Sequence, residues 1–162
     1  MENLQQNEDV DSKIIQLVCF KLADEEYGVD IKQVQEVIRV QKITPVPQMP
    51  DFVLGIINIR GNIIPVFDMR KKFGLPDKKF DLNTKFLVAK VKGTLLSFVV
   101  DEILDNVKIE SKNIEPAPAV KMNIPKDCLS GVGLIEKRMI IILDIYKINE
   151  RILSDIASYS PS

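Results

Sequence analysis

The sequence predicts a single domain built mainly from β-strands, with a few short helices. About nine or ten short stretches rich in β-branched and apolar residues are separated by turn signals at regular intervals, which is typical of a barrel or a sandwich. The 162 residues include 46% apolar and 28% charged residues. This composition is that of a globular domain large enough to fold without a metal or a disulfide.

A polar tail precedes the first predicted strands. Residues 1–13 are rich in acidic and amide side chains, and we expect them to form a mobile tail. Residues 14–22 alternate loosely between polar and apolar positions, which favours a strand. The acidic turn at 24–26 separates this strand from a short second strand at 27–30.

The next segment has a helical period. Apolar residues recur at helical spacing, at Ile31, Val34, Val37 and Ile38. Asp30 is a suitable N-cap, because its carboxylate can accept a hydrogen bond from a free N–H group of the first turn. The pattern predicts a short amphipathic helix at 31–38, whose apolar stripe either closes a barrel or receives a partner helix.

A proline-rich loop and a tight hairpin are expected next. Three prolines at 44–50 exclude a helix or a central strand, because proline lacks an N–H donor and has a fixed φ. Apolar strands at 55–60 and 63–67 flank the pair Gly61-Asn62, which predicts a hairpin.

The rest of the chain predicts two further hairpins. One joins strands at 84–91 and 94–100, and the other joins strands at 129–135 and 139–143. Between them we expect a short strand at 107–109 and then an irregular stretch, which contains Pro116, Pro118 and Pro125.

Two of the hairpins are followed by an aspartate and a helix. Asp68 is placed to cap a short helix at 69–73, and Asp144 is placed to cap the final helix. The final helix has apolar residues on one side, at Ile145, Ile148, Ile152 and Ile156. The units at 55–74 and 129–157 are therefore similar, which hints at two related subdomains.

The charged residues and the absence of histidine narrow the function. There are 22 basic and 23 acidic residues, for a net charge of −1. This balance argues against non-specific nucleic-acid binding and against a polybasic membrane anchor. The chain contains no histidine, which removes the commonest general base and the commonest zinc ligand. We therefore expect a protein that is not an enzyme.

The sequence favours a cytoplasmic protein. The N-terminus has neither a basic segment nor an apolar one, so it does not resemble a signal peptide. The longest nearly apolar stretch, at 139–143, is far too short to span a bilayer. Cys19 and Cys128 lie in apolar runs without metal-ligand spacing, and we expect two reduced core thiols.

Three charged motifs have both a structural and a functional interpretation. The basic cluster Arg70-Lys71-Lys72 with Lys78-Lys79 is interpreted as a solvated helix face rather than an RNA-binding patch. The acids at 24–26 and at Asp101-Glu102 are interpreted as solvated surface. Arg60 either staples its hairpin, for example through Asp68, or is displayed to a partner.

Several of these residues also form a recognisable pattern. The run Asn58-Ile59-Arg60-Gly61 followed by Ile64-Pro65-Val66 resembles the CheW family of bacterial chemotaxis coupling proteins. Further matching segments occur in order over 14–150, at 24–31, 34–38, 43–47, 68–70, 99–101, 114–118, 129–131 and 143–144. Met69 departs from the family, which usually has Leu there.

The resemblance implies a fold, a function and two partners. The fold is a pair of SH3-like, five-stranded β-barrel subdomains that share an apolar core. The function is that of a non-catalytic adaptor without a cofactor, which couples transmembrane chemoreceptors to the histidine kinase CheA at membrane-associated arrays. The partners are the tip of methyl-accepting chemoreceptors and the regulatory domain of the kinase. No nucleic acid and no membrane insertion are implied.

The resemblance also assigns binding residues. Those expected to contact the receptor are Val18, Ile31, Val34, Glu36, Val37, Arg60 and Ile103. Those expected near the kinase contact are Val46, Gly55 and Ile63. The adaptor domain is expected at 14–150, with the end of the final helix and a tail at 151–162. A barrel that binds a small ligand or a nucleic acid remains the alternative.

Overall fold

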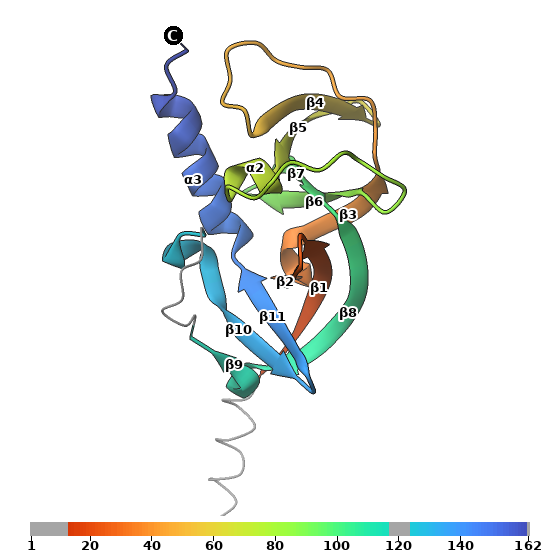
Figure 1. Ribbon diagram of the computed structural model, residues 1–162, viewed down its shortest axis with the longest axis vertical. Coiled ribbons are helices and arrows are strands. Elements are labelled where there is room, and N and C mark those ends of the chain that lie inside the picture. Colours follow the sequence, from red (N-terminus) through yellow and green to blue (C-terminus); the bar gives the residue numbers. More distant parts are fainter. Residues whose placement is uncertain (1–12, 117–123, 162) are drawn as a thin grey trace, which may run out of the picture.

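The computed structural model describes residues 13–116 and 124–161. The expectations for a mobile tail before Lys13 and for Pro118 concern residues outside this range. The described residues form two β-sheets, and helix α3 (Ile145–Ser158) rises from the end of one sheet alongside the other (Figure 1). Among the helices of these residues, none has the length and apolar content needed to cross a membrane.

The six-stranded sheet combines the first two strands of the chain with its last four. Its strands, in spatial order, are β8 (Glu102–Glu110), β1 (Ile14–Leu22), β2 (Glu25–Asp30), β11 (Arg138–Leu143), β10 (Leu129–Ile135) and β9 (Ile114–Glu115). The short 3₁₀ helices η2 (Ser111–Asn113) and η3 (Lys126–Cys128) flank β9 and β10. Five strands were expected in this subdomain; the sixth, β9, is only two residues long.

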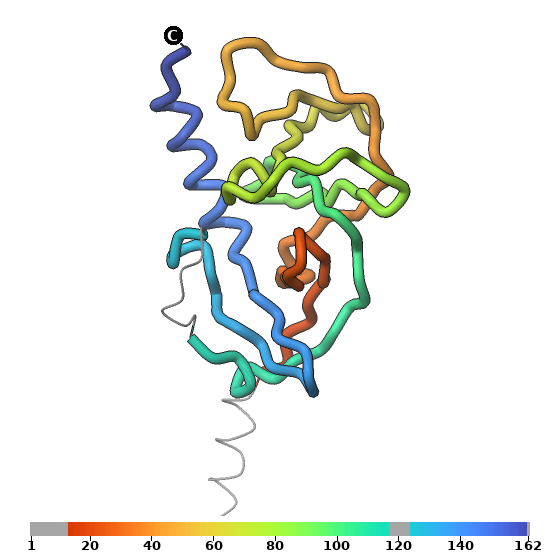
Figure 2. Tube along the Cα trace, viewed as in Figure 1, coloured from red at the N-terminus to blue at the C-terminus, as the bar shows by residue number. Residues whose placement is uncertain are grey.

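The five-stranded sheet is formed by the middle of the chain. Its strands, in spatial order, are β3 (Val34–Arg39), β6 (Lys85–Val91), β7 (Thr94–Val100), β5 (Asn62–Asp68) and β4 (Val53–Ile59). Figure 2 shows this segment on one side of the molecule, with the C-terminal helix α3 running alongside it. Helix α2 (Met69–Lys72) follows β5, and the 3₁₀ helix η1 (Ile31–Gln33) precedes β3.

The two sheets have the same topology. In each, one antiparallel hairpin is joined by a parallel pairing to a second hairpin: β6–β7 to β5–β4, and β1–β2 to β11–β10. Asp68 and Asp144 cap the helices that follow β5 and β11, as expected. The similarity between 55–74 and 129–157 therefore reflects two related subdomains, although one of them takes its first hairpin from the N-terminus.

Three apolar clusters hold the fold together. One fills the five-stranded subdomain around Phe86, and one fills the six-stranded subdomain around Leu17. The largest, which we call the central cluster, lies between the sheets and includes Phe20, Phe98 and α3 residues such as Ile148. Two subdomains around a shared apolar core were expected, and this is confirmed. The burial of apolar surface is the main stabilising contribution to this arrangement.

The predicted hairpins are confirmed, and one predicted helix is wrong. The turn Lys92-Gly93 has positive φ at both residues, which matches the twist of its strands. The helix predicted at 31–38 is instead the 3₁₀ turn η1 followed by strand β3. The strand predicted at 107–109 is longer, because β8 pairs with β1 from Glu102 onward.

Candidate functional site

The apolar residues assigned to a receptor contact all belong to the central cluster or border it. Val18 belongs to this cluster, and Ile31, Val34 and Ile103 pack against it. Val37 lies opposite Leu87, another member of the cluster. We call these five residues the seam, because they come from both sheets and from η1, which connects them.

A β-bulge explains why part of the seam has a helical spacing. The pairing of β3 with β6 shifts between Val34 and Glu36, so that Val34 lies opposite Ala89 and Val37 lies opposite Leu87. Opposed residues in an antiparallel pair have their side chains on the same face. Because Ala89 and Leu87 both belong to the central cluster, Val34 and Val37 share a face despite their spacing of three.

The residues of the seam differ in how exposed their side chains are. Val18 is only 5% exposed, whereas Val37 is 38% exposed. Ile31, Val34 and Ile103 are half-buried. Val37 and the half-buried residues therefore present the apolar surface, and Val18 supports it from below.

Glu36, which precedes Val37 on β3, forms an ion pair with Arg60. The distance from Arg60 Nη2 to Glu36 Oε1 is 2.7 Å, and the Arg60 side chain is 71% exposed. Arg60 and Gly61 both have positive φ, so they form the turn, rather than Gly61-Asn62 as predicted. The suggested partner Asp68 is also wrong, because its Oδ1 accepts hydrogen bonds from the amides of α2 instead.

A corresponding arginine in the other subdomain is paired more completely. Arg138 donates to Asp105 on edge strand β8, at 2.7 and 2.9 Å, and also to Glu26 on β2. The hydrogen bonds that Arg138 donates to Asp105, and then those to Glu26, raise the pKa of Arg138. Its side chain is 32% exposed, less than half the value for Arg60. Both arginines connect an edge strand to a hairpin, but Arg60 presents far more of its guanidinium to solvent.

The residues expected near the kinase contact differ in accessibility. Ile63 on β5 is 59% exposed, and it lines an open hollow with Thr44, Ile56 and Asn58. Val46 is half-buried in the loop before β4, and Gly55 is buried within β4. Ile63 therefore offers the apolar side chain, and a contribution from Gly55 to binding would come through the shape of the hairpin.

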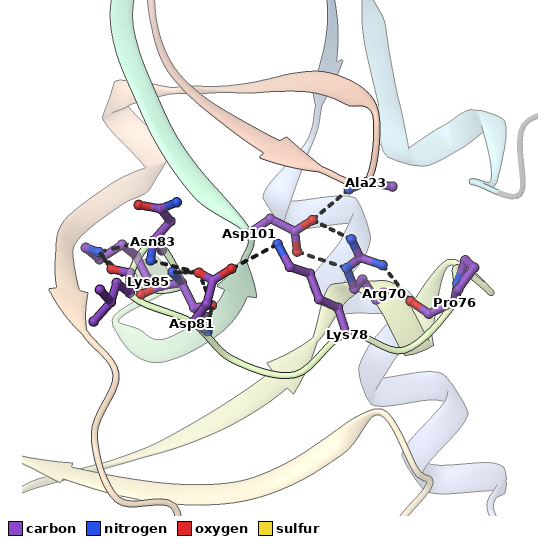
Figure 3. A network of polar contacts seen from close by, with 10 residues as sticks. Ala23, Arg70, Pro76, Lys78, Asp81, Asn83, Lys85 and Asp101 are labelled. Carbon is purple, nitrogen blue, oxygen red and sulfur yellow. Dashed lines mark hydrogen bonds and ion pairs between the residues drawn. The ribbon is translucent and has the colours of Figure 1, made fainter.

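The basic cluster is not a solvated helix face, which corrects that interpretation. Arg70 donates to both carboxylate oxygens of Asp101, at 2.9 and 2.6 Å, and to the carbonyl of Pro76 (Figure 3). Lys72 pairs with Asp155, and its ammonium lies 5.0 Å from the centre of the Phe52 ring. Because these cations are used in local pairs, the cluster does not form the contiguous basic face that nucleic-acid binding requires.

The interpretation of Asp101 as a solvated acid is also wrong. Asp101 is 8% exposed and accepts a third hydrogen bond, from the amide of Ala23 at 2.8 Å. Burial raises the pKa of Asp101. The hydrogen bonds from Arg70 and Ala23 lower this pKa by more, so that it lies below its usual value. The carboxylate is therefore held in its charged form.

The two thiols are buried, as expected. Burial raises the pKa of Cys19 to about 12 and that of Cys128 to about 11. Both thiols are therefore protonated and unreactive near neutral pH. Within residues 13–116 and 124–161, no three Cys, Asp or Glu side chains are grouped so that they could hold a metal ion.

Comparison with known proteins identifies the family. A family model described as the CheW-like domain matches residues 16–152. Chemotaxis protein CheW of Klebsiella aerogenes is 35% identical over 82% of this chain and 80% of its own length. This chain belongs to the CheW family. The expected resemblance is thus confirmed, and CheW proteins are scaffolding proteins rather than enzymes.

Other CheW proteins agree in sequence and in fold. Chemotaxis protein CheW of Helicobacter pylori is 30% identical over 84% of this chain and 82% of its own length. The crystal structure of the scaffolding protein TtCheW from Thermoanaerobacter tengcongensis matches with a TM-score of 0.76 and 34% identity. This match covers 83% of this chain and 86% of TtCheW, so both subdomains are those of a CheW fold.

Proposed function

We propose that this CheW protein is a cytoplasmic adaptor that couples transmembrane chemoreceptors to the histidine kinase CheA in membrane-associated arrays. The seam is the observation that carries the proposal. Its half-buried residues and Val37 are accessible apolar side chains at the central cluster, and Glu36, which precedes Val37, pairs with the exposed Arg60. A surface of this kind suits the apolar face of an amphipathic helix, which a receptor tip would supply.

The kinase contact is proposed on a different surface. An adaptor has to bind both partners at once, so its two sites need separate residues. Val37 shares a face with the central cluster, whereas Ile63 lines the hollow with Gln41, Thr44 and Ile56. We assign the hollow around Ile63 to the regulatory domain of the kinase, with Val46 and Gly55 shaping the surrounding loop and hairpin.

Two charge insertions test the assignment of the two surfaces. We expect Val37→Glu to weaken binding of a receptor-tip fragment by more than about tenfold, because a carboxylate would become desolvated in an apolar contact. Binding of the kinase regulatory domain should remain unchanged. Ile63→Glu should have the converse effect. Calorimetric titration measures the affinity of each variant for each partner, and circular dichroism checks that the variant is folded. A folded Val37→Glu protein that loses only kinase binding would reverse the assignment.

Arg60→Ala tests whether the exposed guanidinium acts on a partner. An exposed ion pair contributes about 0.2–1 kcal/mol, so the melting temperature should fall by less than about 4 °C. Receptor binding should nevertheless weaken. Arg138→Ala is the matched control, because it removes an arginine that pairs with two carboxylates. Arg138→Ala should lower the melting temperature more than Arg60→Ala does and leave receptor binding by the folded protein intact. If instead Arg60→Ala lowers the melting temperature more and leaves receptor binding intact, Arg60 only stabilises its hairpin.

A further inference from the structure

Over residues 13–116 and 124–161, the chain passes between the two sheets twice, and both crossings are short. It leaves the six-stranded sheet after β2 and enters β3 through the three residues of η1. It returns from β7 to β8 through the single residue Asp101. Seam residues flank both places: Ile31 and Val34 at the first crossing, and Ile103 at the second.

Gln33 fixes the first crossing to the start of α3. Its Oε1 accepts a hydrogen bond from the amide of Ile145 at 3.1 Å, and its Nε2 lies 3.5 Å from Asp144 Oδ1. Asp144 Oδ1 also accepts from the amides of Tyr146 and Lys147. A helix begins with N–H groups that have no partner inside the helix. Gln33 therefore completes the cap of α3 while it ties η1 to that helix.

Asp101 fixes the second crossing to both subdomains. Its carboxylate pairs with Arg70 of α2, which follows the five-stranded sheet. The same carboxylate accepts from Ala23 in the turn between β1 and β2, and the Asp101 amide donates to the carbonyl of Lys21 at 3.0 Å. Figure 3 shows the Asp101 carboxylate contacting both Ala23 and Arg70.

We propose that Gln33 and the Arg70–Asp101 pair are positioning residues for the seam. Apolar packing between the sheets is non-directional, so it resists separation more than it resists sliding. Hydrogen bonds depend on angle and distance, and here they hold both crossings in one geometry. They thereby keep Ile103 of one sheet aligned with Val34 and Val37 of the other. This inference rests on the proposed receptor contact at the seam.

Gln33→Glu is the sharpest test, because it preserves the shape of the side chain. One carboxylate oxygen can still accept from Ile145, but the other would face the Asp144 carboxylate, where the amide group now lies. Gln35→Glu is the matched control, since Gln35 is exposed on the adjoining strand β3. We expect Gln33→Glu to weaken receptor-tip binding about fivefold, the value of one hydrogen bond, and to leave kinase binding unchanged.

A distance measurement tests the positioning without any partner. Spin labels at Arg39→Cys and Lys108→Cys, both exposed, would report the spacing of edge strands β3 and β8, and the native thiols are buried. We expect the distance distribution to shift or broaden in Gln33→Glu and to stay unchanged in Gln35→Glu. Gln33→Met, which lacks the amide group, should behave like Gln33→Glu and replaces it if that variant does not fold.

The outcomes separate the positioning role from the receptor contact. An unchanged distance distribution together with normal receptor affinity would overturn the positioning role. An equal loss of receptor and kinase binding, with a lower melting temperature, would show that Gln33 only stabilises the fold. That result would also overturn the positioning role. If the unsubstituted protein binds no receptor tip while the distances shift as expected, the proposed receptor contact fails and the positioning of the two sheets stands.

Discussion

We expect Gly55→Ala to destabilise the domain by about 3 kcal/mol or more, a large part of the roughly 5–15 kcal/mol by which an ordinary domain is stable. A Cβ atom at Gly55 would lie 2.2 Å from the carbonyl oxygen of Thr44, and φ at Gly55 is +146°. Thr44 cannot retreat easily, because it exchanges two backbone hydrogen bonds of 2.9 Å with Ile56. Both the contact and the backbone conformation therefore exclude a side chain.

Gly61→Ala provides the control for this substitution. Gly61 also has a positive φ, of +86°, but a Cβ atom there would meet nothing within 4 Å. We expect a loss of only about 1 kcal/mol, from backbone strain alone. Urea unfolding of both variants measures the difference. Equal losses at the two positions would show that the close approach of Thr44 has no effect on stability.

The same arrangement recurs in the other subdomain. Gly131 has φ +148°, follows a bulge in β10, and would place a Cβ atom 2.6 Å from the carbonyl oxygen of Glu115. Gly55 follows a bulge in β4. Each glycine therefore allows a short extended segment to cross its hairpin closely. This interpretation makes Gly55 a determinant of hairpin shape, and any effect on kinase binding would follow from the position of Ile63.

The sequence was sufficient for the hairpins because their signals are local. Lys92-Gly93 lies between two apolar runs, and such a pair specifies a turn without reference to the rest of the chain. The capped helix α3 was predictable for the same reason. Strand β3 was not, because its bulge spaces Val34 and Val37 as a helix would. The register with β6 that reveals the bulge depends on residues about fifty positions away.

The polar contacts of the site could not be predicted for a related reason. Gln33 and Ile145 are 112 positions apart, and no local pattern distinguishes Gln33 from the exposed Gln35. The sequence indicates a surface position for Asp101, because an acid at a strand end is usually solvated. Its burial arises from the crossing between the sheets, which the spacing of strands does not reveal. Of the seam, Ile31, Val34 and Val37 are indicated by apolar periodicity, and Val18 and Ile103 only by the family resemblance.

We also expect Asp101→Asn to lower the free energy of unfolding by about 3 kcal/mol at pH 7, because it leaves the guanidinium of Arg70 largely buried without a counter-ion. The Arg70 and Asp101 side chains are only 13% and 11% exposed. Asp77→Asn is the matched control: Asp77 pairs with Lys71 from a side chain that is 74% exposed, and such pairs contribute little. A loss no larger than that of the control would contradict a strong contribution from the buried pair.

The pH dependence of this difference gives a second, independent check. Because hydrogen bonds from Arg70 and Ala23 outweigh the opposing effect of burial, the pKa of Asp101 in the folded protein lies below its unfolded value of about 4. The stabilisation is therefore complete above the unfolded pKa and is lost as the pH falls through the folded pKa. Urea unfolding at pH 7 and at progressively lower pH should show the unsubstituted protein approaching Asp101→Asn in stability in acid. A gap that stays constant across this range would mean that Asp101 acts through its shape rather than its charge.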